Sequence, residues 1–233
     1  MKVQEYISSR REARPLHFTL LDPGKTSADD LITLAKQTAE AGTDGFMVGG
    51  STDLSLENVD LAVETIKQTT HMPVILFPTH ASSVSGKADA IFFMSLLNSE
   101  SRQFLVGEQI ASAPWVKKTG LEPLSMAYLV VAPGMTAGRV GQAQPLPRDQ
   151  PDLVVSHALA GQYLGMKYIY LEAGSGASEP VPEDIIKSVR ESIDVTLIVG
   201  GGIRTPESAR KVVAAGADIV VTGTFVETSQ SLK

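Results

Sequence analysis

The sequence predicts a (β/α)8 barrel, and two observations lead to this prediction. Eight short apolar runs alternate with helical patterns through all 233 residues, without a linker between them. The last three runs end in glycine-rich turns, within residues 168–176, 196–204 and 218–224. Glycine lets the backbone approach an anion closely, and the strands of a parallel barrel end at one common face. We therefore expect a single domain over residues 1–233, with a phosphate site at the carboxyl end of the barrel.

Short runs of β-branched and other apolar residues predict the strands. In chain order they span 16–21, 45–49, 73–77, 90–94, 126–131, 168–172, 196–200 and 218–222. Turn residues stop the first run at once, in the sequence Asp22-Pro23-Gly24.

Helical patterns fill most of the connections between these strands. They span 27–41, 57–69, 100–119, 153–164, 182–192 and 206–215. Ser27 is placed to cap the first helix, Gly42 to end it, and Pro206 lies in the first turn of the last one. We expect the helical stretch before residue 120 to be broken at Pro114.

Three segments depart from a regular βα pattern. Residues 78–89 are rich in small and polar side chains, which predicts an irregular third crossover in place of a helix. Residues 133–151 are dense in Gly, Pro and Gln, which predicts an inserted loop. Residues 225–233 leave room for about two helical turns, so we expect a short C-terminal helix.

Composition narrows the class of protein. The 43% apolar content supports a sizeable core, and a formal net charge of −6 disfavours nucleic acid as a partner. The absence of cysteine excludes disulfides and thiolate chemistry. Residues 1–18 lack an apolar signal core, and no apolar run approaches about 18 residues. We therefore expect a soluble, cytoplasmic protein, with peripheral membrane contact left open through an exposed apolar groove.

Asp22 is the first candidate for chemistry, because it directly follows a predicted barrel strand. A carboxylate at that place can hold Mg²⁺, and Lys25 nearby can neutralise a phosphate. Ser51 follows the second strand and could add a hydroxyl ligand to the same cation. Asp22 could equally belong to a simple turn, and the motif alone leaves these two interpretations balanced. Ser51, taken alone, is more often part of a simple turn.

Glu172 is the second candidate, at the end of a strand and directly before a glycine turn. Tyr170 lies two residues earlier, on the same face of that strand. Together they could grip the hydroxyl groups of a polyol phosphate, with Glu172 taking a proton from one of them. The alternative is a glutamate paired with a lysine or arginine at the barrel rim. The adjoining glycines favour a functional role.

Histidines contribute little to the predicted site. His17, His71 and His157 fall in a strand start, a loop and a helix, and we expect structural roles for them. His80 follows the third strand and is a weaker candidate for a substrate contact. No zinc spacing, nucleophile-elbow motif or Walker motif is present in the sequence.

Taken together, these segments resemble the geranylgeranylglyceryl phosphate synthase family. The resemblance runs over nearly the whole chain, through HFTLLDPGK, DGFMVGGS, ADAIFFMSLLNS, YIYLEAGSG, IVGGGIR and VTGT in that order. It implies a prenyltransferase with a TIM-barrel fold that joins geranylgeranyl diphosphate to the C3 hydroxyl of sn-glycerol 1-phosphate. Diphosphate is released, and the product is an ether lipid precursor.

The resemblance also implies roles for particular residues of this sequence. Asp22 and Ser51 match the family's Mg²⁺ positions, and Glu172 with Tyr170 would orient and deprotonate the glycerol. The predicted substrate-binding residues are Lys25, Tyr170, Leu171, Glu172, Ala173, Gly174, Ser175, Gly176, Gly201, Gly202, Gly223 and Thr224. The family further implies a homo-oligomer, a dimer or a hexamer. Trp115 could anchor such an interface, or it could cap the barrel core.

Two other functions remain open at this stage. A sugar-phosphate isomerase would keep the glycine turns, but it would usually place an acid–base pair on opposite sides of the barrel. A non-catalytic barrel could bind a phosphate ligand as a sensor. The sequence does not determine the preferred length of the prenyl chain, although one bulky residue on the groove wall could set it.

Overall fold

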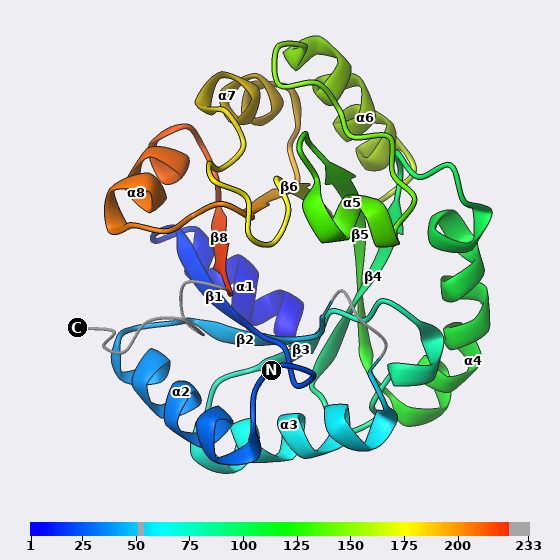
Figure 1. The fold of residues 1–233 in the computed structure, drawn as a ribbon, viewed down its shortest axis with the longest axis vertical. Helices are drawn as coiled ribbons and strands as arrows, with labels where there is room; N and C mark the ends of the chain where they lie inside the picture. Colours follow the sequence, from blue (N-terminus) through cyan, green and yellow to red (C-terminus); the bar gives the residue numbers. More distant parts are fainter. Residues whose placement is uncertain (51–53, 224–233) are drawn as a thin grey trace.

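The computed structural model describes residues 1–50 and 54–223, which form a closed barrel of parallel strands (Figure 1). The strands are β1 (Leu16–Leu21), β2 (Gly45–Val48), β3 (Val74–Leu76), β4 (Ala90–Leu96), β5 (Glu122–Val130), β6 (Tyr168–Glu172), β7 (Thr196–Gly200) and β8 (Ile219–Thr222). Each strand pairs with the next one in the chain, and β8 closes the barrel by pairing with β1. The predicted (β/α)8 barrel is confirmed.

Helices surround the strands in Figure 1. They are α2 (Ala28–Glu40), α3 (Leu56–Thr69), α4 (Glu108–Thr119), α6 (Pro151–Tyr163), α7 (Glu183–Ser192) and α8 (Pro206–Ala214). Side chains cap several of them at the first turn: the Ser27 hydroxyl accepts the Asp30 N–H at 3.2 Å, and Thr205 accepts the Ser208 N–H at 3.1 Å. These caps satisfy backbone donors that a helix leaves without partners, and the cap predicted at Ser27 is confirmed.

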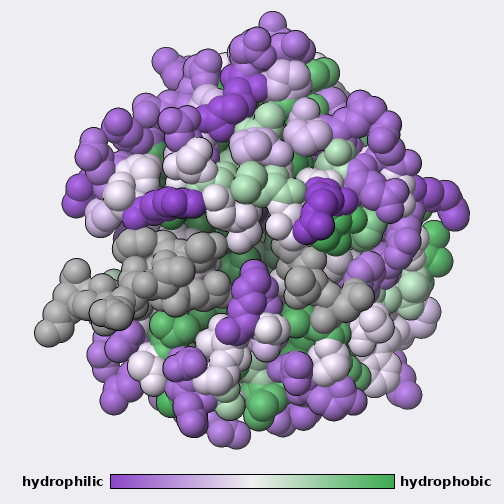
Figure 2. All heavy atoms as spheres, in the orientation of Figure 1, coloured by the Kyte–Doolittle hydropathy of each residue, from purple (hydrophilic) through white to green (hydrophobic). Residues whose placement is uncertain are grey.

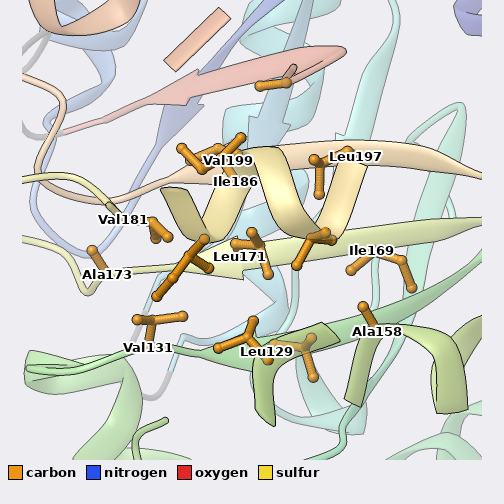
Figure 3. Packing of buried hydrophobic residues seen from close by; sticks show 14 of the residues in the cluster. Leu129, Val131, Ala158, Ile169, Leu171, Ala173, Val181, Ile186, Leu197 and Val199 are labelled. Atoms are coloured by element: carbon orange, nitrogen blue, oxygen red, sulfur yellow. The ribbon is translucent and has the colours of Figure 1, made fainter. Parts of the chain in front are cut away.

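The core has two layers because each strand presents alternate side chains to opposite faces. The barrel interior holds large side chains such as Phe18, Phe92 and Tyr168, each at most 2% exposed. The outer faces of β5, β6 and β7 pack against α6 and α7, where Leu171 and Ile186 lie close together (Figure 3). Burying one such aliphatic or aromatic side chain stabilises the fold by about 1.5–3 kcal/mol.

An N-terminal helix that we did not predict, α1 (Val3–Arg11), closes the amino end of the barrel. Val3 and Ile7 are buried in the interior cluster. Glu122, the first residue of β5, accepts the Val3 N–H at 2.5 Å, and the Tyr6 hydroxyl donates to the Asp44 carbonyl at 2.8 Å. The helix carries too few apolar residues for a clear amphipathic pattern, so its burial is decided by the open barrel end that it covers.

The third crossover is irregular, as the sequence predicts. Between β3 and β4 it contains a single short 3-10 turn, Ala81–Ser83. The chain therefore lacks an ordinary helix between these strands, and this part of the barrel rim is lined by loop residues.

Two expectations about the connections are wrong. Helix α4 continues through Pro114, and the irregular part lies before it, as a π-helical turn over Gln103–Gly107. A proline removes the hydrogen bond of its own nitrogen, but Ser112 and Val116 on either side are buried, which holds α4 against the barrel. The expected loop at 133–151 contains a short helix, α5 (Met135–Val140).

Residues 225–233, where we expect a short C-terminal helix, lie outside the described residues. No helix in the described part of the chain is both long and apolar enough to span a bilayer.

Candidate active site

Glu172 ends β6, and its buried carboxylate is held by hydrogen bonds. The residue is 6% exposed, and its Oε1 accepts the Gly174 N–H at 2.6 Å. The phenols of Tyr128 and Tyr170 also donate to this carboxylate. Burial raises the pKa of Glu172 above its ordinary range, and the hydrogen bonds from Gly174, Tyr128 and Tyr170 oppose that rise. A raised pKa makes the carboxylate a stronger base, which suits it to accept a proton from a hydroxyl group.

Two tyrosines contact the Glu172 carboxylate, and a phenylalanine ring packs against both of them. Tyr128 on β5 and Tyr170 on β6 are partners in the strand register, with ring centroids 5.1 Å apart and edges facing rings. Phe77, just after β3, lies 5.4 Å from Tyr128 and 5.5 Å from Tyr170. Burial, and then the negative charge of Glu172, raise the pKa of both phenols well above the usual tyrosine range. Both phenols therefore stay protonated and can donate to Glu172.

A small polar pocket of about 50 Å³ lies between Glu172 and the glycine turns. Gly176, Gly201 and Gly202 line it with φ angles of +86°, +79° and +70°, a backbone conformation that favours glycine. A Cβ atom on Gly201 would lie 2.3 Å from Oε1 of Glu172, so a side chain there would collide with the carboxylate. Gly223, after β8, completes the lining.

The glycine turns offer backbone donors to this pocket. In the described part of the chain, the N–H groups of Gly176, Gly201 and Gly202 have no protein acceptor. Gly201 and Gly202 are half-buried and Gly176 is exposed, and backbone N–H groups without a protein acceptor around one small pocket can form an anion site. The fold brings the predicted glycines Gly176, Gly201, Gly202 and Gly223 to one pocket, and phosphate binding there stays a prediction. Thr224 lies outside the described residues.

A larger apolar pocket of about 120 Å³ adjoins the polar one. Its walls come from β4, from the loop after β3, from the start of α4 and from α5. The lining includes Phe77, Ile91, Phe93, Met94, Phe104, Ala137 and Val140. Figure 2 shows this face of the molecule with a hollow near its centre, where apolar residues are visible between polar ones. Leu20, Glu172 and Ser175 border both pockets, which places the Glu172 carboxylate where the two meet.

Asp22 follows β1 and is 4% exposed. The Lys25 ammonium lies 3.0 Å from its Oδ2, and the Gly24 N–H donates to its Oδ1 at 3.0 Å. Asp22 also forms the turn that the sequence offers as the alternative, because its carbonyl accepts the Lys25 N–H at 3.0 Å. A turn residue and a metal ligand are compatible roles for Asp22, because its backbone carbonyl forms the turn while its side-chain carboxylate makes separate contacts.

Gly50, just after β2, packs closely against the Asp22 carboxylate. A Cβ atom there would lie 2.5 Å from both carboxylate oxygens. Within the described residues, no group of three or more His, Cys, Asp or Glu side chains could enclose a metal ion. Mg²⁺ commonly binds through one or two carboxylates and the oxygens of a substrate phosphate, so the carboxylate of Asp22 is the type of ligand that fits it. Ser51, the other predicted ligand, lies outside the described residues.

The motif SLLNS, residues 95–99 at the end of β4, holds the loop that carries α5. The Asn98 side chain donates to the Val130 carbonyl at 2.9 Å and to the Gln144 carbonyl at 2.7 Å, and it accepts the Val130 N–H at 3.0 Å. Ser99 donates to the Gly141 carbonyl at 2.6 Å. These bonds fix both ends of the segment that carries α5. The motif therefore shapes the apolar pocket, and its residues do not line the polar pocket.

Some predicted site residues lie elsewhere. The side chains of Leu171 and Ala173 belong to the outer core cluster, because successive residues of a strand face opposite sides. They line neither pocket and support the site from behind. His80 lines the apolar pocket, with its Nδ1 3.0 Å from Oε1 of Glu108 on α4. It therefore lies against the apolar pocket rather than at the phosphate cradle.

Sequence reasoning missed three residues of the site. Tyr128 and Phe77 flank Tyr170, and Arg204 lines the polar pocket. A weak signal for Tyr128 was present, as a lone polar aromatic residue within the apolar run 126–131. Phe77 carried no such signal, because a phenylalanine at the end of a barrel strand is typical of a core.

Comparisons with known proteins show the family of this chain. Residues 7–233 match the PcrB family. The chain is 53% identical over 232 residues to the geranylgeranylglyceryl phosphate synthase of Pyrococcus horikoshii, a match that covers 100% of this chain and 91% of that protein. The chain belongs to the geranylgeranylglyceryl phosphate synthase family. The expected class of activity, prenyl transfer by a barrel enzyme, is thereby confirmed.

Other members and solved structures extend this family relationship. The Methanothermobacter thermautotrophicus synthase is 47% identical over 233 residues, covering 100% of this chain and 95% of that protein. The crystal structure of (S)-3-O-geranylgeranylglyceryl phosphate synthase from Thermoplasma acidophilum, in complex with sn-glycerol-1-phosphate, has a TM-score of 0.96 at 45% identity. It covers 100% of this chain and 94% of that chain. The N-acetylmannosamine-6-phosphate 2-epimerase of Clostridium perfringens, at 14% identity and a TM-score of 0.57 over 91% of this chain and 87% of that chain, shares the fold alone.

Proposed function

We propose that this protein transfers a geranylgeranyl group to the C3 hydroxyl of sn-glycerol 1-phosphate, forming the first ether bond of archaeal-type membrane lipids. The observation that carries this proposal is the position of Glu172, at the junction of a small glycine-lined pocket and a larger apolar pocket. A reaction between a polar phosphate ester and a long hydrocarbon chain needs such a junction. The names of the relatives and the glycerol phosphate bound in the Thermoplasma acidophilum structure support it.

The glycerol phosphate would bind in the polar pocket. Its phosphate would accept hydrogen bonds from the backbone N–H groups of Gly176, Gly201, Gly202 and Gly223, with Thr224 as a further contact. Its hydroxyl groups would reach toward Glu172 and Tyr170. Glycine turns fix the phosphate without side chains, so the acceptor would be held in a geometry set by the backbone of β6, β7 and β8.

Glu172 would act as the base of the transfer. The C3 oxygen attacks C1 of the prenyl diphosphate, the bond from C1 to the diphosphate oxygen breaks, and Glu172 takes the hydroxyl proton. The phenols of Tyr128 and Tyr170 hold the carboxylate in place while it does so. An allylic diphosphate leaves readily because its developing cation is stabilised by resonance, so the site needs little other acid–base machinery.

Asp22 would hold Mg²⁺, together with Ser51. When bound, the ion would neutralise the negative charge that develops on the leaving diphosphate. The Lys25 ammonium lies 3.0 Å from the Asp22 carboxylate. If Mg²⁺ bound this carboxylate instead, Lys25 would be available to contact the same diphosphate. The prenyl chain would extend into the apolar pocket, where its hydrocarbon wall excludes water from the reacting carbon.

The alternatives have weaker support. A sugar-phosphate isomerase usually needs a second acid–base group across the barrel, and among the described lining residues of the polar pocket Glu172 supplies the one carboxylate. Neither an isomerase nor a phosphate sensor has a use for the apolar pocket that meets Glu172.

Conversion of labelled geranylgeranyl diphosphate with sn-glycerol 1-phosphate tests the proposal. We expect an organic-extractable ether product and one diphosphate released for each ether formed, with strict dependence on Mg²⁺ and loss of activity in excess chelator. The 3-phosphate enantiomer should react more slowly. Diphosphate release without ether product, or undiminished activity in chelator, would contradict the proposal.

We also propose that the protein is a cytoplasmic homo-oligomer, a dimer or a hexamer, that touches the membrane peripherally to deliver its lipid product. Trp115 is a candidate interface residue. It is 40% exposed, and its indole N–H donates to the Val84 carbonyl at 2.9 Å, so it covers the irregular crossover instead of the barrel core. Light scattering should give at least twice 24.8 kDa. A monomer at micromolar concentration would rule out the oligomer.

A further inference from the structure

Arg204 lies in the turn between β7 and α8 and lines the polar pocket. Among the described residues that line this pocket, it is the one that carries a positive charge. Its Nη2 donates to the Gly176 carbonyl at 2.8 Å, which joins the turn after β6 to the turn after β7. The two turns that supply the phosphate donors are therefore held together by this side chain.

The guanidinium of Arg204 has donors to spare. A guanidinium carries five N–H groups, and the structure commits one of its nitrogens to Gly176. No carboxylate of the described residues lies within 4.0 Å of it, whereas Arg14 and Arg190 are both in ion pairs with aspartates. An arginine held beside an anion site without a carboxylate partner is suited to bind a phosphate oxygen directly.

Charge balance in the pocket points the same way. Glu172 must be ionised to act as a base, and a phosphate dianion entering beside it would meet a negative charge. Arg204, which lines the same pocket, offsets that charge. The backbone N–H groups contribute only partial positive charges. A substrate with a full negative charge, such as glycerol phosphate, therefore needs the Arg204 guanidinium more than uncharged glycerol does.

We propose that Arg204 binds the phosphate of the acceptor and thereby makes the protein select phosphorylated over unphosphorylated glycerol. This proposal rests on the proposed function, and it assigns a specificity-determining residue within that site. Arg204 holds Gly176 with one nitrogen and has the others for the phosphate.

Two substitutions, Arg204→Gln and Arg204→Lys, test the role, with Arg210→Gln as the matched control. Arg210 is exposed on α8, and its substitution makes the same change of charge away from the pocket. We expect Arg204→Gln to raise KM for sn-glycerol 1-phosphate by about 10- to 100-fold, the range typical of a lost charge-assisted hydrogen bond. We expect kcat and KM for geranylgeranyl diphosphate to stay within about threefold, Arg204→Lys to recover part of the loss, and Arg210→Gln to match the wild type.

The ratio of transfer to glycerol phosphate over transfer to free glycerol should fall in Arg204→Gln in proportion to the rise in KM. Unchanged KM for glycerol phosphate would overturn the proposal, and so would a rise confined to the prenyl diphosphate. Titration with inorganic phosphate, followed by the thermal unfolding midpoint, separates this inference from the proposed function. If the wild type makes no ether but phosphate stabilises it and not Arg204→Gln, the proposed function fails and the phosphate role of Arg204 stands. If phosphate stabilises both equally, the role of Arg204 is wrong.

Discussion

The two pockets that meet at Glu172 are built in different ways. The polar pocket is formed by the glycine turns after β6, β7 and β8 together with side chains such as Glu172 and Arg204, and its shape depends on φ angles that favour glycine. The apolar pocket is lined by side chains from β4, α4, α5 and the irregular crossover. A pocket formed by glycine turns has a fixed shape and little tolerance for substitution, whereas a pocket lined by side chains can be resized by a single residue. We therefore expect the acceptor to be narrowly specified and the prenyl donor to be adjustable.

The largest expected effect is at the junction of the pockets. Glu172→Gln keeps the size and most hydrogen bonds of the side chain but cannot accept a proton. We expect kcat to fall by about 100- to 10,000-fold, the typical contribution of a positioned base, with both KM values nearly unchanged. Steady-state kinetics with saturating substrates measure this. A wild-type rate in Glu172→Gln would show that the base is another group.

The raised pKa of Glu172 predicts how activity and stability depend on pH. Because burial raises its pKa, the acid side of the kcat/KM profile should fall off at a higher pH than an ordinary glutamate would give. The raised pKa means that the unfolded chain releases this proton before the folded one does as pH rises. Stability of the wild type should therefore decrease between the ordinary glutamate pKa and the raised one, and Glu172→Gln should be the more stable protein at neutral pH. Urea unfolding of both proteins at acidic and neutral pH measures the difference.

The next largest effect is expected at Asp22, where the donor's diphosphate would meet the cation. Asp22→Asn should lower kcat by more than about 100-fold, since the stabilisation of the leaving group is worth several kcal/mol. Excess Mg²⁺ should recover part of the loss. Asp29→Asn, an exposed position on α2, is the control and should keep wild-type activity. Near-normal turnover in Asp22→Asn would remove Asp22 from the metal site.

Gly201→Ala tests whether the polar pocket depends on its backbone. The substitution places a Cβ 2.3 Å from Oε1 of Glu172, and it strains a positive φ. Gly165→Ala is the matched control, because Gly165 has a φ of +88° but no atom within 4 Å of the added Cβ. Both variants should lose about 1–2 kcal/mol of stability from backbone strain, and Gly201→Ala should lose more, because its Cβ would also lie 2.6 Å from the Gly174 nitrogen. Only Gly201→Ala should also raise KM for glycerol phosphate, by at least about tenfold. Equal kinetics in the two variants would show that the collision is unimportant.

Ala137→Phe tests the adjustable pocket. Ala137 on α5 lines the apolar pocket, and the larger side chain should shorten it. We expect KM for geranylgeranyl diphosphate to rise by about tenfold and a shorter prenyl diphosphate to become the better donor. KM for glycerol phosphate should not change. Ala160→Phe, at an exposed position of α6, is the control. A matching rise in KM for glycerol phosphate would show that the two pockets are not independent.

The smallest effect is expected at Tyr170. Tyr170→Phe removes one neutral hydrogen bond, worth about 0.5–1.5 kcal/mol, so KM for glycerol phosphate should rise by about 2- to 12-fold. Tyr168→Phe is the control, because Tyr168 is buried on the same strand and lines neither pocket. If Tyr168→Phe shifts KM as much as Tyr170→Phe does, the effect comes from packing of the interior and not from the acceptor.

The difference between the polar and the apolar pocket also explains which parts of the site could be predicted from the sequence. The sequence alone indicates the glycines of the polar pocket, Gly176, Gly201 and Gly202. Glycines that recur directly after predicted strands are typical of turns that approach a ligand. The residues of the apolar pocket, such as Phe93 and Ala137, have the same residue types as any core. We predicted Leu171 and Ala173 as site residues because they lie within the run 170–176. The alternation of side chains along β6 directs both of them toward the outer helices.

The sequence by itself determined the eight strands, the irregular third crossover and the glycine turns, since these follow from local periodicity and from the backbone freedom of single residues. Tertiary structure alone decided the rest. It placed Tyr128 and Phe77 around Glu172, carried α4 through Pro114 and closed the barrel with α1. Each of these outcomes depends on contacts between segments far apart in the chain, where burial and hydrogen bonds outweigh the local preferences that a sequence displays.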